Sequence, residues 1–137
     1  VRENVSLPLL LQGVAPAEAE TRADELLQLV GLTNRADNFV HQLRGVEQQR
    51  TAIARALVHR PSLLIADEPT GNLDTASAER VLGLLREIAE EKIATLILVT
   101  HSAEVAALAT RLIEMRDGKI LRDELTGRTE KDPANKS

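Results

Sequence analysis

Two uninterrupted apolar runs constrain this sequence more than any other feature. Residues 63–66 are Leu-Leu-Ile-Ala and residues 95–100 are Thr-Leu-Ile-Leu-Val-Thr, and neither run alternates with charged residues. Runs without polar alternation are typical of strands covered on both faces, as in a parallel sheet. A strong helical pattern over 75–91 separates them, and Asp74 or Thr75 can cap that helix. The sequence therefore predicts a strand–helix–strand unit with parallel strands.

Helical spacing of apolar residues predicts two further helices before this unit. One runs from Pro16 to the capping Gly31, and the other covers 47–59 and is ended by Pro61. The other expected elements are an apolar segment of undetermined type over 1–13, a polar irregular stretch over 32–46, a turn over 69–74, a short helix over 103–110, a hairpin of residues 112–115 and 119–121 around Asp117-Gly118, and a polar end.

The composition excludes several classes of function. Seventeen basic residues against 21 acidic ones give a net charge of −4, which disfavours binding to duplex nucleic acid. Phe39 is the only aromatic residue, too few for a single-strand stacking platform. The chain has no cysteine, which excludes a disulfide framework, a thiolate zinc site and a cysteine nucleophile. No apolar run approaches the roughly 20 residues of a transmembrane helix.

Polar side chains follow both predicted strands. Asp67 and Glu68 follow the first strand. Thr100 is the last residue of the second run, and His101 follows it. Ligands of open α/β sheets bind at the carboxyl ends of the strands, and a right-handed crossover places both ends at one edge. One carboxylate can hold Mg²⁺ through water and the other can act as a general base. Alternatively, the two carboxylates only end a strand and cap the next turn.

Four motifs in sequence resemble those of the ATP-binding-cassette (ABC) ATPases. Residues 63–68 resemble the Walker B motif, residues 72–74 resemble the D-loop, and His101 matches the switch histidine. Residues 43–50, LRGVEQQR, resemble an altered signature motif LSGGEQQR and are called here the signature segment. The resemblance covers 1–121 and is closest to the group that serves lipoprotein release and macrolide export (MacB-type).

The resemblance implies a partial P-loop NTPase (RecA-like) core with parallel strands plus an α-helical subdomain. Residues 1–46 would be most of that subdomain, 47–122 the C-terminal part of the core, and 123–137 a polar tail. It also implies ATP and Mg²⁺ as cofactors. The implied partners are a membrane permease and a second ATP-binding subunit in a head-to-tail dimer, without nucleic acid. The protein would be peripheral on the cytoplasmic face of the inner membrane.

The resemblance also implies roles for individual residues. Asp67 would bind Mg²⁺ through water, Glu68 would be the catalytic base, and His101 would contact the γ-phosphate. Asp74 would lie at the dimer interface. The residues that would close over the ATP of the opposite subunit are Arg44, Gly45, Val46, Glu47 and Gln48.

Two departures from the family lead us to expect weak ATP binding by the isolated chain. No G-x-x-x-x-G-K-[ST] phosphate-binding loop occurs in the 137 residues, and the first residue is Val1 rather than Met, so we expect an N-terminal truncation. In the signature segment, Arg44 replaces a serine and Val46 replaces a glycine. Arg44 can reach phosphate or block the closed dimer, and a β-branched Val46 would be strained in a backbone conformation that only glycine adopts.

Two other functions stay open from the sequence. The chain could be an inactive cassette remnant that acts as an interaction or regulatory module for a complete subunit. It could also be an ATP-independent, metal-dependent hydrolase that uses Asp67, Glu68 and His101.

Overall fold

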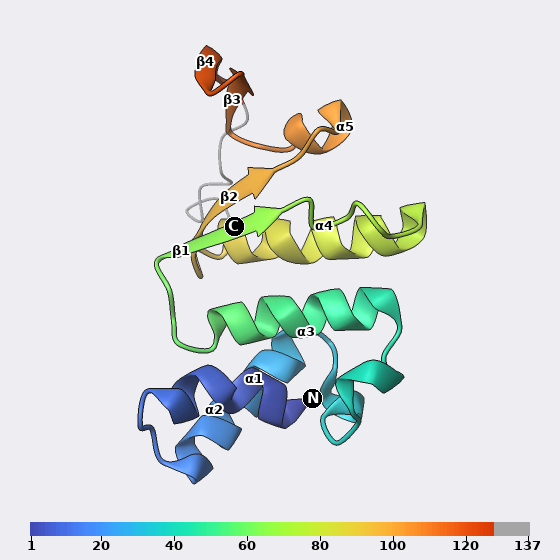
Figure 1. Ribbon diagram of the computed structural model, residues 1–137, viewed down its shortest axis with the longest axis vertical. Coiled ribbons are helices and arrows are strands. Elements are labelled where there is room, and N and C mark those ends of the chain that lie inside the picture. Colours follow the sequence, from blue (N-terminus) through green and yellow to red (C-terminus); the bar gives the residue numbers. More distant parts are fainter. Residues whose placement is uncertain (128–137) are drawn as a thin grey trace, which may run out of the picture.

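The computed structural model describes residues 1–127 of the protein (Figure 1). Its elements follow one another as helices first and then alternating strands and helices. They are α1 (Arg2–Leu11), α2 (Pro16–Leu29), the 3₁₀ turns η1 (Thr33–Arg35) and η2 (Val40–Gln42), α3 (Gly45–Leu57), β1 (Leu63–Asp67), α4 (Thr75–Glu90), β2 (Thr95–Val99), α5 (Ala103–Ala106), β3 (Arg111–Arg116) and β4 (Lys119–Leu125).

Helices α1, α2 and α3 pack together as a helical lobe. The apolar segment whose type the sequence left open is helix α1, and it buries Val5 and Leu9 against the core. The chain leaves α1 through Gly13, whose φ of +81° is a conformation that glycine adopts without steric penalty. Helix α2 buries Ala19, Ala23, Leu26 and Leu27, the small and apolar positions of its predicted helical face.

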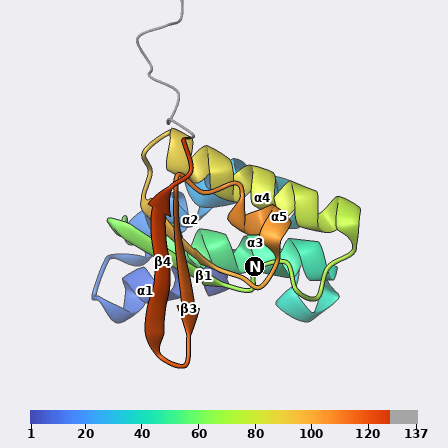
Figure 2. The same cartoon turned by 90° about the horizontal axis from the view of Figure 1, so that it is seen from above.

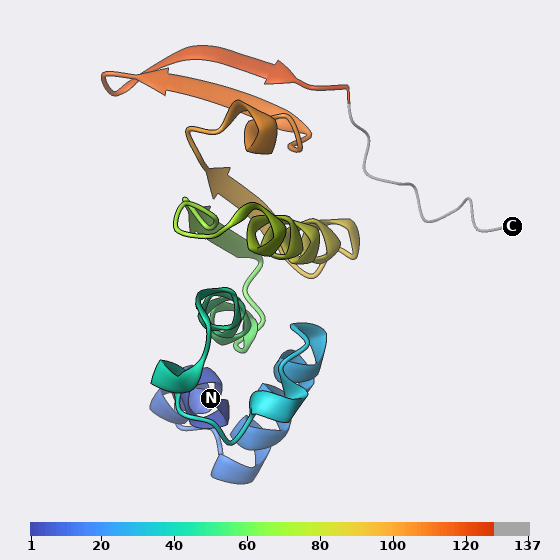
Figure 3. The same ribbon diagram turned by 90° about the vertical axis from the view of Figure 1, so that its right-hand side faces the viewer.

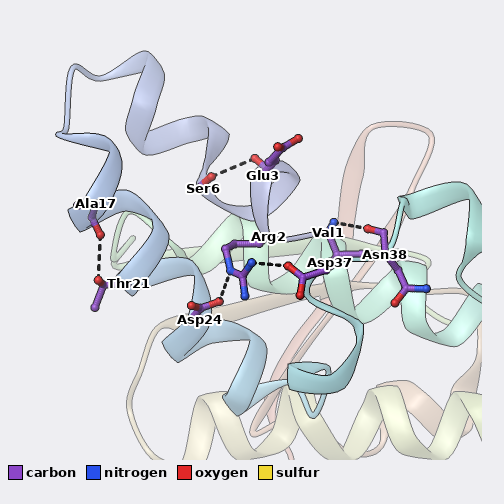
Figure 4. A network of polar contacts seen from close by, with 9 residues as sticks. All are labelled: Val1, Arg2, Glu3, Ser6, Ala17, Thr21, Asp24, Asp37 and Asn38. Carbon is purple, nitrogen blue, oxygen red and sulfur yellow. Dashed lines mark hydrogen bonds and ion pairs between the residues drawn. The ribbon is translucent and has the colours of Figure 1, made fainter.

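Arg2 ties three segments of this lobe together (Figure 4). Its Nε lies 2.6 Å from a carboxylate oxygen of Asp24 in α2, and its Nη1 lies 2.5 Å from Asp37 in the loop after η1. The Val1 amino group donates to the Asn38 carbonyl oxygen over 2.6 Å. These contacts fix the start of α1 against the irregular segment that leads to α3.

Strands β1 and β2 form the predicted parallel pair, and α4 is the crossover between them. Leu64 pairs with Leu96 and Ala66 with Leu98, and these four side chains pack toward the core. Helix α4 covers that face of the strands (Figure 3), and its buried residues Val81, Leu84, Leu85 and Ile88 lie at helical spacing. The parallel topology brings the carboxyl ends of both strands to one edge, as predicted.

The opposite face of this pair corrects the prediction that both strand faces are covered. Ile65 is 62% exposed and Ile97 is 47% exposed, and they are register partners. Leu63 and Val99 on the same face are exposed as well. The cause is that α4 packs on the other side of the strands (Figures 1 and 3), and within residues 1–127 this face is left exposed to solvent.

The described chain ends in the antiparallel hairpin β3–β4, which projects beyond the strands (Figure 2). Its second strand reaches Leu125, longer than the predicted 119–121 and into the segment assigned to the tail, while α5 is shorter than the predicted 103–110. Residues 128–137 of the predicted tail lie outside the described residues. None of the described helices combines the length and the apolar character that crossing a bilayer requires.

Candidate functional site

The two strand ends meet through Glu68 and His101. Glu68 Oε1 accepts a hydrogen bond from the backbone N–H of His101 over 2.8 Å and lies 2.6 Å from the Nδ1 atom of the same residue. The strand register makes this contact possible, because the Glu68 N–H donates to the Val99 carbonyl oxygen and so extends the ladder past β1. The carboxylate and imidazole predicted at this edge are therefore in direct contact.

Glu68 occupies an uncommon backbone conformation. Its φ is +44°, in the left-handed region that residues other than glycine rarely adopt. The chain reverses here, since Gly71 N–H donates to the Glu68 carbonyl oxygen. Asp67 precedes it as the last residue of β1, pairs with Val99, and is exposed. The turn thus directs the Glu68 carboxylate to the strand end and leaves Asp67 on the uncovered side of the strands.

The signature segment forms the start of α3, with Arg44 as its N-cap residue. Glu47 in the first turn accepts a hydrogen bond from the Arg44 backbone N–H over 2.9 Å, and its other oxygen lies 3.5 Å from Arg44 Nη2 and 3.3 Å from Arg35 Nε. The Arg44 N–H and the two guanidinium groups hold the pKa of the buried Glu47 carboxyl below its usual range. Glu47 therefore stabilises the start of α3 and its contact with Arg35.

The replaced signature residues behave differently from one another. Val46 is buried in the core and has no positive φ, so the strain expected for a glycine-only conformation does not arise. Arg44 has a side chain that is 75% exposed. Gln48 donates from its amide to the Leu43 carbonyl oxygen over 3.0 Å, which braces the turn before α3.

Two shallow clefts join the signature segment to the residues after β1. One, of about 260 Å³, is lined by Gly45, Gln48, Gln49, Glu68, Pro69, Asn72 and Leu73. The other, of about 290 Å³, is lined by Arg44, Gly45, Val46, Asn72, Leu73, Asp74, Ser77 and Arg80. The N-terminus of α3 therefore faces the turn 69–74, and Gly45 approaches Leu73 closely enough that an added Cβ would lie 3.6 Å from its side chain.

Asp74 is the N-cap of α4, which decides between the two predicted caps, Asp74 and Thr75. Its Oδ1 accepts a hydrogen bond from the Ser77 backbone N–H over 3.0 Å. Hydrogen bonding by the Ser77 side chain, together with this backbone N–H, holds the pKa of Asp74 below its usual range. The cap fixes the end of the turn that lines both clefts, while the carboxylate itself is exposed.

The sequence predicted that Glu68 and His101 lie at one edge, but it assigned no role to three residues that the structure places at the site. These are Arg35, Asn72 and Arg80. Arg35 lies 12 positions from Glu47 in an irregular segment, so no periodicity connects them. Asn72 stood inside the D-loop resemblance without an assigned role, and Arg80 follows Asp74 on α4 at a spacing that gave no signal of its own.

The donor atoms at the strand ends do not make a metal site by themselves. Among residues 1–127 no group of three or more His, Asp or Glu side chains is arranged to hold a metal ion. Mg²⁺ in nucleotide sites commonly takes one or two carboxylates and completes its shell with water and phosphate. Asp67 supplies one such carboxylate, and the rest of the shell would come from water and phosphate.

Sequence and structure comparisons identify what this arrangement is similar to. The family model described as "ABC transporter" matches residues 1–71. The chain is 49% identical over 119 residues to the lipoprotein-releasing system ATP-binding protein LolD of Gluconobacter oxydans, covering 87% of this chain and 52% of that protein. It is 48% identical over 122 residues to the macrolide export ATP-binding/permease protein MacB of Azoarcus sp., covering 89% of this chain and 18% of that protein.

The chain is also similar to solved structures of ABC cassettes. The dimeric post-hydrolysis structure of the ATP-binding cassette MJ0796 with ADP and Pi matches with a TM-score of 0.77 and 38% identity, covering 93% of this chain and 57% of that one. The CbiO1 protein of Clostridium perfringens, part of an ABC transporter complex, matches with a TM-score of 0.80 and 29% identity, over 89% and 49% of the two chains. The chain spans about half the length of LolD and of these two cassettes. It has the α/β fold of ABC ATPase cassettes and belongs to the ABC transporter ATP-binding family.

Proposed function

We propose that this chain is the C-terminal part of the ATP-binding subunit of an ABC transporter, in which MgATP binding and hydrolysis drive a membrane permease. The observation that carries the proposal is the contact between Glu68 and His101 at the ends of two parallel strands. A carboxylate at this edge of an α/β sheet lies where ligands of such sheets bind.

In this proposal Glu68 is the general base and His101 holds it in place. The base accepts the proton of an attacking water, and the His101 backbone N–H fixes one carboxylate oxygen so that the other is free for that proton. When the γ-phosphate is present, the exposed His101 ring exchanges its contact with Glu68 for one with phosphate. Asp67 would hold Mg²⁺ through water, and a bound ion would supply positive charge beside the phosphates.

The start of α3 serves a second subunit in this proposal. Backbone N–H groups at a helix N-terminus attract phosphate, and Gly45 permits close approach. The ATP would be bound mainly by the opposite subunit of a head-to-tail dimer, with Gln48 and Arg44 beside it and Asp74 at the interface. The helical lobe of α1–α3 would dock on the permease at the cytoplasmic face of the membrane. The phosphate-binding loop that the 137 residues lack would belong to another part of the cassette.

A fused cassette tests the catalytic roles. Here the part of Gluconobacter oxydans LolD without a counterpart in this chain is joined to residues 1–137, and MgATP hydrolysis is measured. We expect Glu68→Gln to lower the rate at least 100-fold while MgATP binding is retained, because the amide cannot accept the proton. Equal rates for the unsubstituted fused cassette and its Glu68→Gln variant would exclude Glu68 as the base. The 137-residue chain alone should bind ATP weakly, and micromolar affinity would contradict that part of the proposal.

The altered signature segment supports a second candidate, an inactive cassette remnant that regulates a complete subunit. Arg44 brings a long cation, paired with Glu47, to the position of a small hydroxyl. Arg44→Ser in the fused cassette separates the two candidates. A rise in hydrolysis that depends on Glu68 favours a restrained ATPase, whereas an unchanged absence of hydrolysis favours the remnant. The ATP-independent hydrolase would have to hold its metal ion without phosphate oxygens as ligands, with Asp67 as the available carboxylate beside the Glu68–His101 contact.

A further inference from the structure

Two arginines share one carboxylate oxygen of Glu47 at the start of α3. Arg44 Nη2 lies 3.5 Å from Glu47 Oε1, and Arg35 Nε lies 3.3 Å from the same atom. The Glu47 side chain is only 11% exposed, whereas the side chains of Arg35 and Arg44 are 42% and 75% exposed. Because like charges repel, each guanidinium weakens the attraction between the carboxylate and the other guanidinium. The position of the more exposed Arg44 side chain therefore depends on Arg35.

Glu47 remains paired when the Arg44 side chain moves away. Its Oε2 atom still accepts the Arg44 backbone N–H over 2.9 Å, and its Oε1 atom still lies beside Arg35. The buried carboxylate is then not left without a cation, a change that would be strongly destabilising. Without Arg35, in contrast, Arg44 is the one remaining guanidinium within ion-pair distance of Glu47 among residues 1–127. Arg35 thus lowers the free energy needed to release Arg44.

Arg44 lines a cleft in which an anion would be its alternative partner. The cleft of about 290 Å³ is also lined by Arg80, which forms no ion pair within the described residues. Asp74 lies there too, but its Oδ1 atom accepts the Ser77 backbone N–H. A guanidinium has no acceptor atom, so the Arg44 side chain does not cap the N–H groups of the first turn of α3. Phosphate oxygens bind both guanidinium groups and such N–H groups.

We propose that Arg35 is a positioning residue that controls Arg44 through Glu47. With the cleft empty, Glu47 interacts with both arginines and Arg44 stays beside the start of α3. When the triphosphate of ATP on the opposite subunit reaches the cleft, Arg44 moves to a phosphate oxygen and Arg35 alone neutralises Glu47. The proposal rests on the proposed function, because it regulates how that nucleotide meets the signature segment. Arg35 acts through Arg44 and does not contact the nucleotide.

Chemical modification of arginine tests the shared contact without nucleotide. Phenylglyoxal reacts with guanidinium groups, and its reaction with Arg44 in the 137-residue chain is followed by peptide mass spectrometry, with the exposed Arg86 as internal reference. We expect Arg35→Gln to slow the modification of Arg44 about threefold, because Glu47 then holds Arg44 alone. Glu47→Gln should accelerate the modification of Arg44 by about the same factor, since the carboxylate charge is gone.

Hydrolysis kinetics of the fused cassette test the regulatory role. Arg35→Gln should raise the KM for ATP about threefold and change kcat by less than about twofold, because a firmer Arg44–Glu47 contact opposes nucleotide binding and not the chemical step. Arg35→Lys should keep the KM near its original value, since the cation is retained. In a cassette that also carries Arg44→Ser, Arg35→Gln should leave the KM unchanged. A residue that only supports the fold would act in both backgrounds.

Arg122→Gln is the control for both measurements. Arg122 is also an exposed arginine paired with a glutamate, Glu124, but it lies on the hairpin β3–β4. Its replacement should change neither the modification of Arg44 nor the KM. Circular dichroism checks that each variant is folded.

Two outcomes would overturn the proposal. One is that Arg35→Gln changes the modification rate of Arg44 no more than Arg122→Gln does. The other is that Arg35→Gln raises the KM equally with and without Arg44→Ser. A fused cassette that hydrolyses no ATP contradicts the proposed function instead, and the modification rates, which need no nucleotide, then decide whether Arg35 controls Arg44.

Discussion

The Nδ1 atom of His101 lies 2.6 Å from the Oε1 atom of Glu68, although 33 positions separate them in the chain. The same oxygen accepts the backbone N–H of His101 over 2.8 Å. One carboxylate oxygen is therefore held by two groups of a single residue, while the ring that holds it is 87% exposed. The contact joins two strand ends and leaves the imidazole accessible to a ligand.

His101→Ala separates a functional role of this contact from a structural one. In the fused cassette we expect the hydrolysis rate to fall by about 10²-fold, the order of loss that follows when a reacting group is misplaced by about 1 Å, because the proposed base loses the ring that holds it. The free energy of unfolding of the 137-residue chain should change by less than about 0.5 kcal/mol, because the ring is exposed. His59→Ala, another exposed histidine, is the control and should leave both quantities unchanged. Equal effects of the two substitutions would remove His101 from the mechanism.

Glu47→Gln removes the charge that Arg44 and Arg35 stabilise. At pH 7 we expect a loss of about 1 kcal/mol in the free energy of unfolding, measured by urea denaturation and circular dichroism. The folded-state pKa of Glu47 is depressed, so its contribution is present above the pKa of the unfolded chain and disappears as the pH falls through the folded value. The difference in the free energy of unfolding between the unsubstituted chain and the Glu47→Gln variant should therefore disappear at acidic pH.

Glu18→Gln is the matched control for this substitution. Glu18 is also the third residue of its helix, in α2, but it is exposed. Its replacement should change the free energy of unfolding little at pH 7 and at acidic pH. A difference at Glu47 that persists unchanged at acidic pH would show that the charge is not the stabilising feature.

Asp74→Ala should lower the thermal midpoint by removing the N-cap of α4. The reason is that the Ser77 N–H loses its acceptor at the start of the helix. Asp74→Asn should keep most of the midpoint, because asparagine caps helices comparably. The depressed pKa of Asp74 means that the contribution of its charge is lost as the pH falls through the folded value. Identical midpoints for Asp74→Ala and the unsubstituted chain would contradict the cap.

Ile88→Ala tests the packing of α4 against the covered face of the strands. Ile88 is fully buried, and its truncation should cost about 2–5 kcal/mol of stability in urea denaturation, from lost burial and the cavity left behind. Ile93→Ala, at a position 40% exposed just after α4, should cost less than about 1 kcal/mol. Similar losses at the two positions would mean that α4 does not provide the core.

The parts of the fold that the sequence predicted are those recorded in local patterns. The apolar runs around Ile65 and Ile97 indicated strands, and parallel topology then brought Glu68 to His101 without knowledge of any distance. The ion pair between Arg35 and Glu47 could not be predicted, because an irregular segment has no period that fixes where a side chain points. The uncovered face could not be predicted either, since an apolar run records what a strand can bury and not what is there to bury it.

At Glu68 the stability of the fold and the proposed role as general base favour different residues. Its φ of +44° is a conformation in which an ordinary side chain costs about 1–2 kcal/mol and glycine costs almost nothing. Selection that acted only on the free energy of unfolding would replace this residue with glycine, and the carboxylate would be lost. If the proposed role of Glu68 holds, a chain that no longer uses it is expected to drift toward glycine here, and the residue at position 68 in related sequences then indicates whether that role is kept.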